Sequence, residues 1–178
     1  MATEDRVNDF VIRIATVNGT GSTSANSLLM KAIFRMGIPV VGKNYFPSNI
    51  QGLPTWFEVR ISEKGYLGRT EGVDIAVAVN PQSYNEDLRE INSGGYLIYD
   101  SSWKRDFERT DINIIEIPLT KLCVEEFSNP KTRLLFKNIV YVGALSYLLG
   151  MDKEIYETLI AEQFKGKGKL IAPNIKAL

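Results

Sequence analysis

The stretch from Asp9 to Gly37 constrains the fold more than any other part of the chain. Residues 10–15 (FVIRIA) are short, β-branched and mostly apolar, which predicts a strand buried in a sheet. The sequence TVNGTG at 16–21 breaks this pattern, and from Leu28 the apolar residues recur with the period of a helix that ends at Gly37. A strand, a glycine turn and a helix in this order predict the opening unit of a Rossmann-like domain.

The glycine turn is the first candidate site. Its backbone N–H groups and the N-terminus of the following helix are able to hold an anion, which makes four residues candidates for cofactor binding. These are Gly19, Thr20, Gly21 and Ser22. Three residues offer a side-chain N-cap for the helix: Ser22, Thr23 and Ser24. The GxGxxG signature of dinucleotide-binding proteins is absent, which favours a second interpretation, in which the glycines only let the chain turn tightly from sheet to helix.

Strand and helix patterns alternate along the rest of the chain. Strands are predicted at 38–43, 55–62, 73–80, 96–100 and 111–118, and helices after Pro81, at 119–127, at 130–150 and from Asp152 to Phe164. A turn at 63–66 indicates an antiparallel excursion, and Gly94 and Gly95 predict a turn into the strand at 96–100. The pattern predicts a three-layer α/β/α Rossmann-like domain with a mostly parallel, mixed sheet. Ligands in such folds lie beyond the carboxyl ends of the strands, so Asn80, at the end of the near-continuously apolar strand, is a further candidate for cofactor binding.

The domain is predicted to occupy residues 1–164. Residues 165–169 (KGKGK) are typical of a linker, and residues 170–178 are apolar. We therefore expect 165–178 to be a linker or tail that leads to a further domain in a longer chain. Within the predicted helix at 130–150, Gly143 would allow another backbone to approach closely.

The composition excludes several kinds of function. The chain has no histidine and a single cysteine, so it lacks the commonest general base and the ligand sets of zinc sites and iron–sulfur clusters. We expect no catalytic constellation and no metal site, with Cys123 buried in an apolar segment. Lys+Arg and Asp+Glu are equal at 21 each, which gives no electrostatic case for nucleic acid. No apolar run is long enough to span a bilayer, and the near absence of cysteine fits a cytoplasmic location.

A long loop follows the second predicted strand, with the sequence NYFPSNIQG at 44–52, and Arg60 lies on the strand after it. On this segment the chain resembles the gamma-type domain of 2-oxoacid:acceptor (ferredoxin) oxidoreductases, most of all the version fused to the N-terminus of the alpha subunit in 2-oxoglutarate-type enzymes. Asn80, Asn138 and Gly143 also match family positions. Many members carry GxGGxG in the opening turn, where this chain has Thr16 and Asn18 in place of the first two glycines.

The resemblance implies an accessory role. The family oxidatively decarboxylates 2-oxoacids such as pyruvate or 2-oxoglutarate with coenzyme A, giving acyl-CoA, carbon dioxide and reduced ferredoxin. Thiamine diphosphate, Mg and the iron–sulfur clusters are expected on partner alpha and beta domains, and coenzyme A is a co-substrate. This domain would pack beside the thiamine-bearing domains, line the coenzyme A entry, and meet ferredoxin through the complex. The residues expected to contact the partner or coenzyme A are Tyr45, Pro47, Ser48, Asn49, Gln51, Gly52 and Arg60.

Plainer interpretations stay open beside this one. Tyr45 and Phe46 would also serve as a cap on the domain's own core, and Arg60 as one half of a structural ion pair with Glu58 or another neighbour. The alternative function is a stand-alone nucleotide-binding module that uses the turn at 19–21. Without a partner, the chain is not expected to be an active enzyme.

Overall fold

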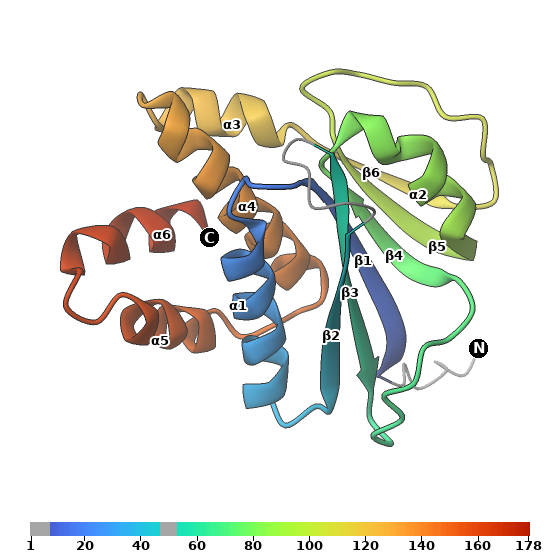
Figure 1. The fold of residues 1–178 in the computed structure, drawn as a ribbon, viewed down its shortest axis with the longest axis horizontal. Helices are drawn as coiled ribbons and strands as arrows, with labels where there is room; N and C mark the ends of the chain where they lie inside the picture. The colour runs from blue at the N-terminus through green and yellow to red at the C-terminus, as the bar shows by residue number, and fades with distance from the viewer. Residues whose placement is uncertain (1–7, 47–52) are drawn as a thin grey trace.

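The computed structural model describes residues 8–46 and 53–178, and these form a mixed six-stranded sheet flanked by helices (Figure 1). The strand order is β2-β3-β1-β4-β5-β6. The strands are β1 (Asp9–Val17), β2 (Val40–Tyr45), β3 (Pro54–Ser62), β4 (Val73–Ala78), β5 (Ile91–Asp100) and β6 (Asn113–Ile117). Strand β3 is antiparallel to both of its neighbours, whereas β1, β4, β5 and β6 pair in parallel. The predicted mostly parallel sheet with an antiparallel excursion is confirmed.

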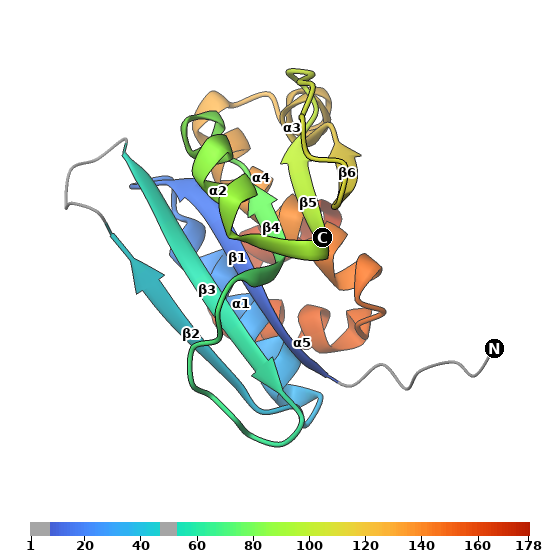
Figure 2. The ribbon, with the colours of Figure 1, turned by 90° about the vertical axis from the view of Figure 1, so that its right-hand side faces the viewer.

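The helices make the outer two layers of the domain. They are α1 (Ser22–Arg35), α2 (Tyr84–Glu90), α3 (Leu119–Glu126), α4 (Pro130–Leu148), α5 (Lys153–Gln163) and α6 (Ile171–Ala177), with short 3₁₀ turns at Pro81–Ser83 and Gly168–Leu170. Helix α2 covers one face of the sheet, and α1 and α4 cover the other, with α5 and α6 outside them (Figures 1 and 2). This is the predicted three-layer α/β/α arrangement. Among the described helices, none combines the length and the apolar character that a bilayer span requires.

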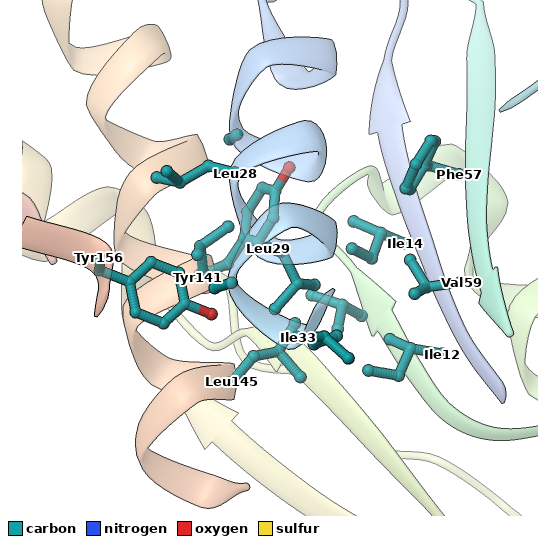
Figure 3. Close-up of a cluster of buried hydrophobic side chains, with 14 of the residues drawn as sticks. Ile12, Ile14, Leu28, Leu29, Ile33, Phe57, Val59, Tyr141, Leu145 and Tyr156 are labelled. Atoms are coloured by element: carbon teal, nitrogen blue, oxygen red, sulfur yellow. The ribbon is translucent and has the colours of Figure 1, made fainter. Parts of the chain in front are cut away.

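Strand β1 lies at the centre of the core because most of its side chains are apolar and both of its faces are covered. Ile12 and Ile14 are fully buried and point toward Leu29 of α1 and Leu145 of α4 (Figure 3). On the other face, Val11 packs in a second cluster beneath α2. A strand that is buried on both faces appears in the sequence as a short, mostly apolar run. The pattern at residues 10–15 therefore predicted β1 correctly.

Side-chain caps fix the starts of three helical segments where the sequence indicated them. The Asn80, Asn129 and Asp152 side chains each accept a hydrogen bond from the backbone N–H two residues later, at 3.1, 2.9 and 2.9 Å. Each such bond satisfies one of the N–H groups that a helix start leaves without a partner.

The long loop predicted between the strands at 38–43 and 55–62 is shorter than expected. Asn44 and Tyr45 belong to β2 and Pro54 begins β3, so the segment connects two antiparallel strands of one hairpin. The turn at 63–66 does form, with the Gly65 N–H donating to the Ser62 carbonyl at 2.9 Å, but the strand that follows it pairs with β1 and not with β3. The antiparallel excursion was therefore predicted correctly and its hairpin turn was placed wrongly.

A second correction concerns the glycine pair at 94–95. Both residues lie inside β5, which begins at Ile91, and not in a turn after a helix. The pairing of β5 with β4 shifts its register between Val73 and Ile75, which accommodates Gly94 with a φ of 81°. Glycine is common both in turns and at irregularities in strand pairing, so the sequence alone does not distinguish the two.

Residues 165–178 are ordered into structure where a linker was expected. A 3₁₀ turn and α6 follow α5, and Ile171, Ile175 and Leu178 pack against the main hydrophobic core. The glycine- and lysine-rich stretch serves as the bend between α5 and α6. Its composition indicated flexibility, but the apolar residues after it gain more by packing on α4 and α5 than by facing water. A further domain beyond 178 stays a prediction.

Candidate functional site

The carboxyl edge of the parallel strands brings two of the predicted groups together. Strands β1 and β4 are parallel neighbours, so the glycine turn after β1 lies beside Asn80, which follows β4. Asn80 is buried, and its side-chain amide donates to the Thr16 carbonyl oxygen at 3.5 Å. The structure therefore joins the ends of the two strands at the edge where Rossmann-like folds place their ligands.

The glycine turn has backbone geometry that only glycine adopts easily. Gly19 and Gly21 have φ values of 86° and 79°. A Cβ on Gly21 would lie 2.6 Å from Cδ2 of Leu135 on α4. The Thr20 hydroxyl donates to the Val17 carbonyl at 2.8 Å, and the Thr20 carbonyl accepts from Asn138 at 2.9 Å. The turn is thus held to its own strand and to α4, which supports its structural role.

Helix α1 starts one residue earlier than the first of the predicted caps, Ser22, would allow. Its N-cap is Gly21, no side chain caps the helix, and Ser22 is already its first residue. The Ser22 hydroxyl accepts a hydrogen bond from the Thr16 hydroxyl at 2.9 Å. Ser22, Thr23 and Ser24 are therefore not caps. An uncapped N-terminus leaves the first N–H groups of the helix available to an anion or to water.

A cavity of about 330 Å³ lies beside the first turn of α1. Its lining comes from the end of β1 and the turn after it, the end of β2, the start of β3 and the start of α1: Thr16, Asn18, Gly19, Gly21, Ser22, Thr23, Asn26, Asn44, Phe46, Thr55, Trp56 and Phe57. The described lining is rich in hydroxyls, amides and aromatic rings and contains no charged residue. Such a surface suits a neutral polar group or a single anion on the helix N-terminus. It does not supply the cations that the several phosphate charges of coenzyme A or a dinucleotide favour.

Arg60 lies away from this cavity. It faces Val11 near the start of β1, whereas the glycine turn follows the other end of that strand. Only 7% of Arg60 is exposed, and its guanidinium pairs with Asp9 and donates to the Ile61 carbonyl at 2.5 Å. Arg60 and the residues of the turn therefore do not form one site. The ion pair that was the plainer interpretation is present, with Asp9 as the partner in place of Glu58.

Tyr45 is the described member of the predicted contact loop. It lies at the end of β2 opposite Trp56. Its ring faces the Lys43 ammonium at 5.1 Å and the Arg69 guanidinium at 5.5 Å from the centroid. Phe46, the next residue, is half-exposed. The other predicted contact residues lie outside the described part of the chain: Pro47, Ser48, Asn49, Gln51 and Gly52.

A buried polar cluster beside the cavity was not predicted. The Trp56 indole N–H donates to Oδ1 of Asp87 at 2.8 Å, and the Ser83 hydroxyl donates to Oδ2 of the same carboxylate at 2.7 Å. Burial raises the pKa of Asp87 to about 6, although the hydrogen bonds from Ser83 and Trp56 oppose the rise. The sequence did carry a signal, because Asp87 stands three residues after Tyr84 on the apolar face of a predicted helix.

Cys123 is buried, as expected from its apolar surroundings. Burial raises the pKa of its thiol to about 11, which keeps it protonated and a poor nucleophile at neutral pH. Within residues 8–46 and 53–178, no three His, Cys, Asp or Glu side chains gather in a way that would hold a metal ion.

Another cavity, of about 750 Å³, lies at the opposite end of the sheet. Its lining is mainly apolar and comes from the amino-terminal halves of the strands and from the ends of α1 and α4, including Phe10, Met36, Tyr96 and Leu148. Among the described residues, none of those predicted to bind a cofactor or a partner lines it.

The fold and its carboxyl-edge cavity define a Rossmann-like α/β domain. Residues 11–178 match the family described as pyruvate ferredoxin/flavodoxin oxidoreductase. This match covers nearly the whole chain, and the protein belongs to that family. The resemblance stated from the sequence is confirmed.

Relatives of this family occur both as longer chains and as chains of similar length. The chain is 23% identical to subunit alpha of 2-oxoacid:ferredoxin oxidoreductase 2 from Aeropyrum pernix, and the alignment covers 96% of this chain and 33% of the relative. It is 26% identical to 2-oxoglutarate synthase subunit KorC from Archaeoglobus fulgidus, over 86% of this chain and 78% of the relative. The chain thus spans about a third of the first relative and most of the second.

Solved structures share the fold. The 2-oxoglutarate:ferredoxin oxidoreductase from Magnetococcus marinus, solved with 2-oxoglutarate, coenzyme A and succinyl-CoA bound, matches with a TM-score of 0.84 and 25% identity over 96% of this chain and 30% of that one. The pyruvate oxidoreductase subunit PORC from Thermotoga maritima matches with a TM-score of 0.75 and 22% identity over 96% of this chain and 93% of that one. The second likeness concerns the fold alone.

Proposed function

We propose that this chain is the non-catalytic gamma domain or subunit of a 2-oxoacid:ferredoxin oxidoreductase. In the assembled enzyme a 2-oxoacid is oxidatively decarboxylated with coenzyme A, which gives acyl-CoA, carbon dioxide and reduced ferredoxin. The observation that carries the proposal is the family match over residues 11–178, together with the likeness of 96% of this chain to about a third of the Magnetococcus marinus enzyme. A 2-oxoglutarate-type substrate is favoured because that enzyme was solved with 2-oxoglutarate bound.

The partner-facing region of this domain is proposed to be the end of the β2–β3 hairpin. Tyr45 and Phe46 stand there, next to the cavity beside the first turn of α1. Alpha and beta domains that hold thiamine diphosphate, Mg and iron–sulfur clusters would pack against this end. Arg60, buried near the start of β1, enters this proposal only by stabilising β3.

We propose that coenzyme A enters the assembled enzyme through a channel between this domain and its partner. This domain would form one side of the channel. The cavity's hydroxyls and amides fit a polar segment such as the pantetheine arm, and the open N-terminus of α1 fits one phosphate. The absence of charged residues from the described lining argues that the remaining phosphate charges are met by another domain. We further propose that the complex is cytoplasmic and that ferredoxin binds its partner subunits.

The test is capture of the native protein from its source cells with an antibody against residues 153–178. The eluate is assayed for reduction of a dye that requires both a 2-oxoacid and coenzyme A, with 2-oxoglutarate and pyruvate compared and coenzyme A omitted as the control. The captured chain is sized on a gel, and its iron is measured. We expect coenzyme A-dependent activity and iron in the eluate.

A captured chain without iron, partner or activity would contradict the proposal. The alternative is then a stand-alone nucleotide-binding module, and a thermal-shift measurement decides on it. A module that binds adenine nucleotides in the cavity at α1 would be stabilised by them at modest excess. A gamma domain would respond to its partner subunits and not to free nucleotide.

A further inference from the structure

Asp87 is a buried carboxylate whose hydrogen-bond partners are neutral. Only 1% of the residue is exposed. Its two oxygens accept from the Trp56 indole at 2.8 Å and from the Ser83 hydroxyl at 2.7 Å. The nearby Arg13 forms its ion pairs with Glu86 and Glu90, at 3.1 and 3.3 Å, and no ion pair of Asp87 is present among the described residues. Burying a carboxylate without a cation beside it costs free energy, which favours the protonated form of Asp87.

The Ser83 hydroxyl has one proton and two acceptors within reach. Its oxygen lies 2.7 Å from Oδ2 of Asp87 and 3.0 Å from the carbonyl oxygen of Asn80. An ionised carboxylate is a stronger acceptor than a carbonyl, so the Ser83 hydroxyl donates its hydrogen bond to Asp87. The Trp56 indole can only donate, so Oδ1 must remain an acceptor in both charge states of Asp87. A proton bound to the carboxyl group therefore belongs on Oδ2, where it would point at Ser83.

We propose that Asp87 and Ser83 form a proton-operated switch. With Asp87 ionised, the Ser83 hydroxyl donates to the carboxylate, and the Trp56 indole makes a charge-assisted hydrogen bond. With Asp87 protonated on Oδ2, the carboxyl group donates to Ser83, the Ser83 hydroxyl turns to the Asn80 carbonyl, and the Trp56 bond becomes a weaker, neutral one. One proton is gained, and no other group changes its charge.

The surroundings set the range in which this switch operates. Burial raises the pKa of Asp87 to about 6 and outweighs the opposing hydrogen bonds. Arg13 on β1 favours the ionised form, and Glu86 on the same helix opposes it. Burial raises the pKa of Tyr84, which is also on α2, so its hydroxyl stays neutral near pH 6. The strands beneath α2 contribute Ala76 and Ala78 from β4 and Leu97 and Tyr99 from β5.

The switch reaches the candidate site from two sides. Asn80 follows β4, and its side-chain amide donates a hydrogen bond to the Thr16 carbonyl at the end of β1. Trp56 lines the cavity beside α1. Protonation of Asp87 therefore alters two hydrogen bonds. One joins Ser83 to the Asn80 carbonyl, and the other joins Asp87 to Trp56 in the cavity wall. This inference stands independently of the proposed oxidoreductase role, because it rests on the geometry around Asp87.

The test follows the ¹⁵N–¹H signals of the tryptophan indoles of the full chain as the pH is changed from 7.5 to 4.5. The chain has two tryptophans, Trp56 and the exposed Trp103, so Trp103 is a control in the same sample. We expect the Trp56 proton signal to move upfield with a midpoint near pH 6, as its bond loses charge assistance. In Asp87→Asn, which carries the hydrogen-bond pattern of the protonated state at every pH, the signal should not titrate.

A second variant keeps the inference testable if Asp87→Asn does not fold. Ser83→Ala removes a hydrogen bond that favours the ionised carboxylate, so the Trp56 midpoint should move to higher pH. A Trp56 signal that is constant between pH 7.5 and 4.5, or that titrates equally in Asp87→Asn, overturns the switch. An unchanged midpoint in Ser83→Ala overturns it as well.

Discussion

The backbone of Leu178 lies directly against Gly143 of α4. A Cβ on Gly143 would stand 2.1 Å from the Leu178 carbonyl oxygen, closer than any side chain is tolerated. The contact joins the end of α6 to the middle of α4, two segments that also pack side by side in Figure 1. The close backbone approach that the sequence predicted at Gly143 is confirmed, and the segment that approaches is the one expected to be a linker.

Gly143→Ala should therefore dislodge the end of the chain. Alanine would gain up to about 1 kcal/mol from helix propensity. The clash with backbone atoms should outweigh this gain and lower the free energy of unfolding by about 1–3 kcal/mol. Urea denaturation measures the loss, and limited proteolysis should show faster cleavage between α5 and α6. Gly168→Ala is the matched control, because its Cβ would meet no atom within 4 Å. An unchanged stability in Gly143→Ala would mean that α6 does not pack as described.

Gly21→Ala tests the turn at the start of α1. A φ of 79° is unfavourable for alanine by about 1–2 kcal/mol, and the new Cβ would also press on Leu135, whose methyl group lies 2.6 Å away. Gly37→Ala separates the two causes, since Gly37 has a similar φ of 80° and open space around it. We expect Gly21→Ala to lose more stability than Gly37→Ala in thermal denaturation. Adding Leu135→Ala should reduce that difference, and equal losses would show that Leu135 simply moves aside.

Much of the fold was readable from the sequence because local signals and burial agree. β1, β4 and the capped helices were placed correctly, since an apolar run or an Asn-Pro pair leaves few alternatives. The errors came where one residue type serves two purposes. Glycines 94 and 95 mark an irregular strand as well as a turn, and a lysine–glycine stretch marks a tight bend as well as a linker. The Arg60–Asp9 ion pair and the Trp56–Asp87 hydrogen bond join residues that are 51 and 31 positions apart in the sequence, and no local pattern contains such contacts.

Arg60→Ala should cost stability, because the structure places the guanidinium inside the protein. It would lose the ion pair with Asp9 and the bond to the Ile61 carbonyl, for a total of about 1–3 kcal/mol in urea denaturation. Asp9→Asn removes the charge of the partner and keeps the arginine, so its loss should be smaller. In the assembled enzyme, the KM for coenzyme A should be unchanged in both variants. A raised KM in Arg60→Ala alone, with stability retained, would instead assign Arg60 to the coenzyme A contact.

Asp87→Asn should change how stability depends on pH. The pKa of Asp87 is raised in the folded protein from 3.8 to about 6, so the folded state binds the proton more tightly than the unfolded state. The wild type should therefore lose stability at this residue as the pH rises from about 4 to about 6, by about 3 kcal/mol. Asparagine stays neutral and avoids this loss. The difference in unfolding free energy between Asp87→Asn and wild type should grow in favour of the variant across that interval and stay constant above it.

The comparison needs a control that keeps the carboxylate and alters only its partners. Ser83→Ala serves, because loss of its hydrogen bond raises the pKa of Asp87 further and should extend the pH-dependent loss to higher pH. Denaturation of the three proteins at half-unit steps from pH 4 to 8 gives the curves, and subtracting the wild type removes the contribution of every other carboxylate. Parallel curves for wild type and Asp87→Asn would mean that Asp87 has an ordinary pKa and that its burial is offset by solvent.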